Sequence, residues 1–118
     1  KLAEILSEIS TLKVIMCEVI VDKKKPLNTI TTSLNSEEYK NKSLVLVDDV
    51  LNTGETLMHA SYVILKHNVA KMRTVVLIDR RHRLFPIKAD YAGLTLSTTL
   101  ENHIEVEYEN DEFSAHLE

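Results

Sequence analysis

Two adjacent carboxylates and a short polar turn follow an apolar run in the middle of the chain. The apolar run is residues 44–47, Asp48 and Asp49 come directly after it, and Thr53-Gly54-Glu55-Thr56 precedes a segment with helical spacing. Such a turn aims backbone N–H groups, two hydroxyls and the positive end of a helix dipole at one point, which suits a phosphate. Carboxylates accept hydrogen bonds from sugar hydroxyls. The combination fits a ribose 5-phosphate.

Each of these residues also has an ordinary structural explanation. Paired aspartates are common in solvated loops, and Thr53 is a common type of helix cap. For the aspartate pair taken alone, this explanation is the better one.

The elements around these residues form an α/β pattern. Unbroken apolar and β-branched runs indicate strands covered on both faces, whereas apolar residues every three or four positions indicate helices. Helices are predicted at 1–12 and 57–67, and strands at 13–21, 43–47, 72–78, 91–97 and, as an edge strand, 104–108. Because strand 43–47, helix 57–67 and strand 72–78 form one βαβ unit, the two strands should be parallel.

A long polar segment, residues 22–42, separates the first two predicted strands. We expect one helical turn in it, at Ser36–Lys40, and otherwise a loop. Loops of this length in compact domains are usually functional or mobile.

Composition limits the fold and the function. The chain has 118 residues, 44% of them hydrophobic, and a net charge of −4. It can therefore bury the core of one domain, and a generic nucleic-acid coat or anionic-membrane binder is disfavoured. Cys17, the single cysteine, is expected as a small buried hydrophobe, and five scattered histidines give no ligand pair at zinc spacing. No apolar run is long enough to span a bilayer, so we expect a soluble, cytoplasmic protein.

Glycine is rare, since Gly54 and Gly93 are the only two. The dinucleotide fingerprint needs three close glycines, and the P-loop and the serine-hydrolase elbow need two each. Dehydrogenases and P-loop ATPases are excluded on this ground.

Two runs of residues resemble the type I phosphoribosyltransferases. Residues 44–56, LVLVDDVLNTGET, resemble the family's signature for phosphoribosyl diphosphate (PRPP): an apolar run, two acids, two more apolar residues and a Thr-Gly-x-Thr turn. Residues 76–93, VLIDRRHRLFPIKADYAG, are similar to a segment of the pyrimidine-operon attenuator proteins that double as uracil phosphoribosyltransferases. The resemblance covers residues 43–93 well, and residues 1–21 only as topology.

The resemblance implies the fold and the site. It implies an α/β domain over residues 1–118, a mostly parallel sheet with helices on both faces, with residues 22–42 as a lid. Asp48 and Asp49 would be the catalytic pair, holding the ribose hydroxyls and supporting positive charge at the anomeric carbon. Mg²⁺ would arrive with the diphosphate of PRPP, so no residue is assigned as a metal ligand. The implied PRPP-binding residues are Asp48, Asp49, Asn52, Thr53, Gly54, Glu55 and Thr56, and the implied base-binding residues are Ile78, Asp79 and Arg80.

Two positions depart from the family pattern. Asn52 stands where purine transferases carry an aspartate that handles the purine ring proton, and an amide cannot accept that proton. Glu55 stands where many relatives have Lys or Arg, which puts a negative side chain beside the phosphate. The segment 22–42 also lacks the tyrosine-arginine-acid cluster that is usual in the attenuator family's lid.

We therefore expect a homo-oligomeric protein that transfers the 5-phosphoribosyl group from PRPP to a nucleobase, with uracil favoured over purines, and releases diphosphate. The alternative is a non-catalytic PRPP- or nucleotide-sensing or RNA-binding regulatory domain. Its support is the one basic cluster, Arg80, Arg81, His82, Arg83 and Lys88. An RNA partner is not favoured, because no aromatic platform interleaves these charges.

The sequence begins at Lys1 inside the predicted first helix, without an N-cap residue. We therefore expect a fragment that lacks the family's N-terminal strand, which lies between the strands at 13–21 and 43–47 and whose turn grips the diphosphate. Those two strands should then pair directly, or a partner segment should fill the gap.

Without that turn, we expect this chain to turn over PRPP at least about 10²-fold more slowly than a longer form, since losing one preorganised donor typically costs 10²–10³. A side-by-side PRPP-dependent assay checks this expectation. Equal turnover would show that the turn is dispensable.

Overall fold

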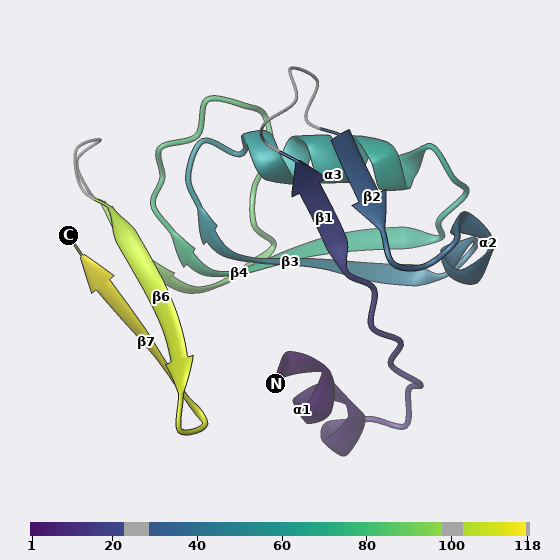
Figure 1. The fold of residues 1–118 in the computed structure, drawn as a ribbon, viewed down its shortest axis with the longest axis horizontal. Helices are drawn as coiled ribbons and strands as arrows, with labels where there is room; N and C mark the ends of the chain where they lie inside the picture. The colour runs from purple at the N-terminus through teal and green to yellow at the C-terminus, as the bar shows by residue number, and fades with distance from the viewer. Residues whose placement is uncertain (23–28, 98–102, 118) are drawn as a thin grey trace.

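The computed structural model describes residues 1–22, 29–97 and 103–117 (Figure 1). Its elements, in chain order, are α1 (Leu2–Ile9), β1 (Val19–Asp22), β2 (Thr29–Thr32), α2 (Ser36–Tyr39), β3 (Ser43–Leu51), α3 (Glu55–Leu65), β4 (Lys71–Asp79), β5 (Tyr91–Thr95), β6 (Ile104–Glu109) and β7 (Glu112–Leu117).

The central sheet has the order β3-β4-β5, and its strands are parallel. The register of the first pair runs from Ser43 opposite Lys71 to Leu51 opposite Asp79, so both strands end at the same edge. The connecting helix α3 lies over one face of this sheet, next to the β1–β2 pair (Figure 1). The predicted α/β class with a mostly parallel sheet is confirmed, and so is the βαβ unit.

The core lies between the sheet and α3. Helix residues Leu57, Ala60 and Ile64 recur every three or four positions and pack with Leu46 of β3 and Val76 of β4. On the opposite face of β3 the alternate side chains Val45 and Val47 are half exposed, at 50% and 51%. The prediction that this strand is covered on both faces is therefore wrong for the described chain.

The strand predicted at 13–21 is mostly wrong. Only Val19–Asp22 is a strand, and it pairs antiparallel with β2 rather than with the central sheet. β2 itself, Thr29–Thr32, lies in the segment expected as a loop. Among the described residues β3 pairs only with β4, so the expected direct pairing of the two flanking strands does not occur.

The rest of the segment 22–42 gives a mixed result. Its helical turn, predicted at Ser36–Lys40, is confirmed as α2. Residues 23–28 lie outside the described residues, so a lid over 22–42 stays a prediction.

The edge strand predicted at 104–108 is β6, which forms an antiparallel hairpin with an unpredicted strand, β7. The connection is Asn110-Asp111, and both residues have positive φ, 50° and 66°. Two positive φ values are characteristic of a type I′ turn, which matches the twist of hairpin strands.

Helix α1 is confirmed, but none of its residues is buried. Its contact with the hairpin is polar: the Lys1 ammonium lies 3.0 Å from both carboxylate oxygens of Asp111. Hydrogen bonds from Tyr108 and Lys1 lower the pKa of the Asp111 carboxyl.

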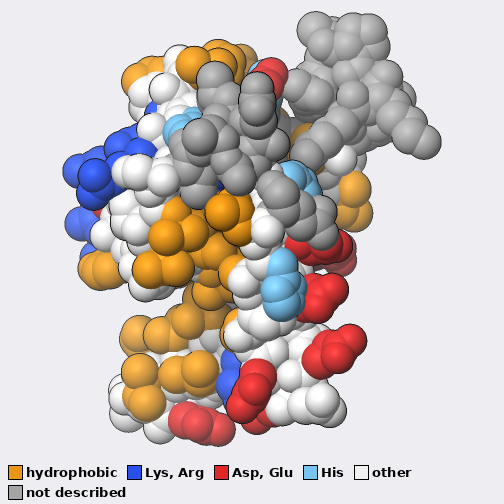
Figure 2. Space-filling model, turned by 90° about the vertical axis from the view of Figure 1, so that its left-hand side faces the viewer, with side chains coloured by type: hydrophobic (Ala, Val, Ile, Leu, Met, Phe, Trp, Pro, Cys, Tyr) orange, Lys and Arg blue, Asp and Glu red, His pale blue; other side chains and the backbone are white. Residues whose placement is uncertain are grey.

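The molecule is more open than a single compact domain of its length. Its radius of gyration is 15.1 Å, against about 13.5 Å for a compact domain of this size. Hydrophobic side chains are exposed over much of one face (Figure 2). None of the helices in the described ranges is long and apolar enough to cross a membrane.

The Asp90 carboxylate holds the start of strand β5 beside β4. Asp90, just before β5, accepts the backbone N–H of the buried Thr74 at 2.9 Å, and the Thr74 hydroxyl donates to the Lys88 carbonyl at 2.7 Å. The hydrogen bond from the Thr74 backbone holds the pKa of the Asp90 carboxyl below its ordinary value of 3.8.

Asp90→Asn should therefore lower the free energy of unfolding above pH 3.8, and the difference from wild type should shrink as the pH falls through the lowered pKa of Asp90. The sign follows because the folded state favours the ionised carboxyl. Urea unfolding near pH 7 and near pH 3 measures it, with Glu112→Gln, an exposed carboxylate on β7, as control. A difference that stays constant with pH would contradict this role.

Candidate functional site

The acid pair lies inside the end of β3 rather than in a loop after it. The sequence predicts a strand that ends at Val47, but the pairing of β3 with β4 continues to Leu51. The Asp48 carboxylate accepts the Asp49 N–H at 2.9 Å, and the Asp49 carboxylate accepts the Val50 N–H at 2.7 Å. These bonds orient the two side chains at the end of the strand.

The turn that follows depends on glycine. Gly54 has a φ of +89° and is the N-cap of α3, whose first hydrogen bond runs from the Met58 N–H to the Gly54 carbonyl. A β-carbon on Gly54 would lie 2.6 Å from Cγ2 of Ile87. Backbone conformation and close packing therefore both require glycine here.

The loop between β4 and β5 packs against this turn. The Thr53 carbonyl accepts two N–H groups from it, that of Leu84 at 2.8 Å and that of Phe85 at 3.2 Å. The Thr53 hydroxyl oxygen in turn accepts the Glu55 N–H at 3.3 Å. Residues some thirty positions apart in sequence thus fix one backbone turn.

The turn and the end of β3 form one pocket of about 40 Å³. It is lined by Asp48, Val50, Leu51, Asn52, Thr53, Gly54, Glu55, Thr56 and Leu57. The lining includes every predicted PRPP-binding residue except Asp49, the neighbour of Asp48 in β3. The pocket lies at the carboxyl end of a parallel strand and the amino end of a helix, where α/β sheets bind ligands.

Glu55 lies along its own helix. Its exposed carboxylate is 3.7 Å from Nε2 of His59, one turn further along α3. When His59 is protonated, this contact offsets the negative charge that the sequence places beside the pocket.

Of the predicted base-binding residues, Ile78 and Asp79 end β4 and Arg80 follows directly, and all three are buried. The exposed fractions are 3% for Ile78, 9% for Asp79 and 7% for Arg80. Asp79 accepts the Arg81 N–H at 2.9 Å. Nη1 of Arg80 donates to Oδ1 of Asn52 at 2.8 Å, which joins the Arg80 side chain to a residue of the pocket.

The basic cluster divides between the interior and the surface. Arg80 is buried, whereas Arg81, Arg83 and Lys88 are exposed and His82 is intermediate. Phe85, between Arg83 and Lys88 in the same loop, is 40% exposed, so the expectation that no aromatic residue interleaves these charges is wrong. Cys17 is partly exposed rather than fully buried.

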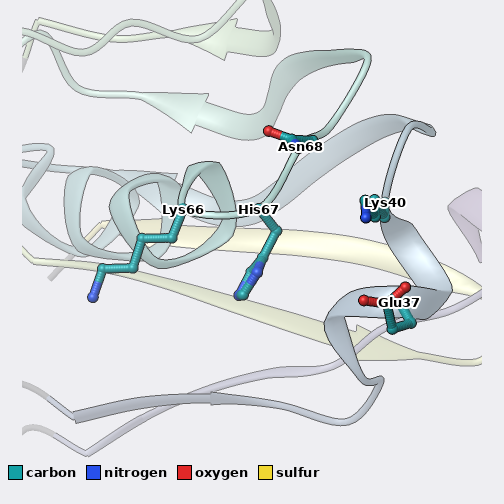
Figure 3. Close-up of a pocket in the computed structure, with 5 residues that line it drawn as sticks. All are labelled: Glu37, Lys40, Lys66, His67 and Asn68. Carbon is teal, nitrogen blue, oxygen red and sulfur yellow. The ribbon is translucent and has the colours of Figure 1, made fainter.

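A larger pocket, of about 140 Å³, lies at the amino end of the sheet (Figure 3). It is lined by Glu37, Lys40, Lys66, His67 and Asn68. The adjacent Ala70 N–H donates to the Lys42 carbonyl, just before β4 and β3 begin. The Lys66 side chain extends away from Lys40 and Glu37 (Figure 3). Since ligands of α/β sheets bind at the carboxyl ends of strands, the smaller pocket is the candidate site.

No group of three or more metal-binding side chains occurs within the described ranges.

Comparison with known proteins finds relatives of this chain. The profile of the phosphoribosyl transferase domain matches residues 2–111. The bifunctional protein PyrR of Haemophilus ducreyi is 39% identical over 89 residues, which are 74% of this chain and 48% of that protein. PyrR of Clostridium novyi is 41% identical over 70 residues, 58% of this chain and 39% of that protein. This chain thus spans less than half the length of these relatives.

Solved structures show the same fold. The hypoxanthine phosphoribosyltransferase of Trypanosoma cruzi in complex with the product IMP aligns with a TM-score of 0.71 and 22% identity, over 87% of this chain and 55% of that one. A second T. cruzi hypoxanthine phosphoribosyltransferase structure, at 1.4 Å, aligns with a TM-score of 0.58 and 22% identity, over 73% of this chain and 46% of that one.

Gly54→Ala should lower the free energy of unfolding by about 2 kcal/mol or more, because alanine is strained at this φ and its β-carbon meets Ile87. Urea unfolding measures the change. In an Ile87→Ala background the same substitution should cost less, since the steric part is relieved and the backbone part remains. An unchanged unfolding midpoint in the single variant would contradict both the backbone strain and the steric contact with Ile87.

Proposed function

This chain belongs to the phosphoribosyl transferase domain family, and from that premise we propose that the protein transfers the 5-phosphoribosyl group of PRPP to a nucleobase and releases diphosphate. The observation that carries the proposal is the pocket at the end of β3, which gathers Asp48, Thr53, Gly54 and Thr56.

In the proposed reaction the turn binds the 5-phosphate and the acids bind the ribose. The N–H groups at the start of α3 and the hydroxyls of Thr53 and Thr56 would surround the phosphate. Asp48 and Asp49 would accept hydrogen bonds from the ribose hydroxyls and stabilise positive charge at the anomeric carbon as the diphosphate departs. Mg²⁺ enters as part of the substrate, bound to the diphosphate.

We propose uracil as the favoured base. Support comes from Asn52, an amide in the pocket where a purine would need a carboxylate to take its ring proton. Ile78, Asp79 and Arg80 would form the wall on the base side.

A second candidate function is a non-catalytic regulator that binds PRPP or nucleotides, or RNA. The observation that favours it is the exposed loop with Arg81, Arg83, Lys88 and Phe85, which combines cations with an aromatic ring. We also propose that the protein is a homo-oligomer, supported by the apolar residues exposed on β3, and that it is located in the cytoplasm.

Asp48→Asn combined with Asp49→Asn should abolish binding of Mg²⁺–PRPP while leaving the fold intact. An asparagine oxygen can still accept the backbone N–H bonds that Asp48 and Asp49 accept, but the charge is lost. Calorimetry measures the affinity. Glu105→Gln with Glu109→Gln, two exposed carboxylates on β6, is the matched control. Undiminished affinity in the aspartate variant would remove these residues from the site.

A longer active form of the protein should use uracil in preference to guanine or hypoxanthine, because Asn52 cannot accept a purine ring proton. Nucleotide product formed from each base at equal concentration measures the preference. Guanine turnover equal to or above that of uracil would reject the pyrimidine assignment.

A further inference from the structure

Arg80 joins the ends of β3 and β4 at the pocket. Its backbone N–H donates to the Leu51 carbonyl at 3.1 Å, and its Nη1 donates to Oδ1 of Asn52 at 2.8 Å. The side chain is only 7% exposed, whereas Asn52 is exposed and lines the pocket. A ligand in the pocket can therefore reach Asn52 more readily than Arg80.

The hydrogen bond fixes which end of the Asn52 amide is available. A guanidinium only donates hydrogen bonds, so the atom that faces it must be the amide oxygen. The Nδ2 amine then lies on the other side of the planar amide. Asn52 consequently offers a ligand two N–H donors.

We propose that Arg80 is a positioning residue, which acts on the base through Asn52. It holds the Asn52 amide oxygen, so that the amide NH2 group is available to the pocket. The inference rests on the proposed function and deepens it. The Asn52 amine donates to an acceptor on the base, and Arg80 need not touch the base itself.

This geometry defines the class of base. An oxo-pyrimidine carries a carbonyl oxygen next to the nitrogen that is ribosylated, and that oxygen accepts the Asn52 amine. A free purine with a proton on its imidazole ring would bring an N–H against the amine, and two donors cannot pair. The buried Arg80 thus sets the hydrogen-bond polarity of the base side.

The test compares two ligands that differ only by the base: UMP and ribose 5-phosphate. Neither carries diphosphate, so the test does not depend on a diphosphate-binding turn. Calorimetry gives the affinity of wild type, Arg80→Met, Asn52→Ala and the double variant for each ligand. Arg73→Met, which removes the same charge from an exposed position on β4, is the control.

We expect Arg80→Met and Asn52→Ala each to weaken UMP binding about five- to tenfold, the value of one lost hydrogen bond, and to weaken ribose 5-phosphate binding much less. The double variant should be no weaker than either single variant, because both remove the same interaction. Arg80→Lys, which keeps a donor, should recover part of the affinity. UMP, but not ribose 5-phosphate, should shift the NMR signals of the Asn52 side-chain amine.

Each other result has a distinct meaning. If wild type binds neither ligand, the proposed function fails and this inference falls with it. If both ligands bind but Arg80→Met weakens them equally, Arg80 supports the fold of the site and the inference is wrong. Additive losses in the double variant would show that Arg80 acts independently of Asn52. Should Arg80→Met fail to fold, the Asn52→Ala affinities and the amine shift decide.

Discussion

The parallel pairing of β3 with β4 determines where the site lies. Residues 28 apart stand opposite each other along both strands, from Ser43 and Lys71 to Leu51 and Asp79. Two segments distant in sequence therefore end at one edge of the sheet. The same offset continues beyond the last pair, where Arg80 reaches Asn52. The contacts of the pocket that cross between the two segments follow from this register.

The site is shaped largely by backbone. Thr53 contributes a carbonyl that accepts two N–H groups of the β4–β5 loop, and Gly54 contributes a conformation that other residues avoid. Because the Thr53 carbonyl is engaged by the loop that packs on the turn, the N–H groups of the turn would be oriented before a phosphate arrives in the proposed function. In the proposed function the side chains would add selectivity, Asp48 for the sugar hydroxyls and Asn52 for the base.

Local pattern was sufficient to predict β3, α3 and β4, because the apolar spacing of residues 43–79 matches the contacts that these elements make. It did not predict that β3 continues through Asp48 and Asp49, because polar residues after an apolar run indicate the end of a strand. Asp48 and Asp49 tolerate the strand because their carboxylates accept adjacent backbone N–H groups. Local pattern also says nothing about the burial of Arg80, because its side chain bonds to a partner 28 residues away. The turn at Asn110-Asp111 was a readable signal for β7, given the preference of these residues for positive φ.

The core cluster has a consequence for the order of folding. Its buried members, Tyr39, Leu46, Leu51, Leu57, Ala60, Ile64 and Val76, come from one continuous stretch of chain. The contacts that build this cluster stay within that stretch, so they require the closure of shorter loops than contacts with the parts of the chain on either side of it. The β3–α3–β4 segment is thus suited to act as the folding nucleus, so the pocket at the end of β3 would take shape with the first cooperative unit, and the β6–β7 hairpin would add to a scaffold already formed.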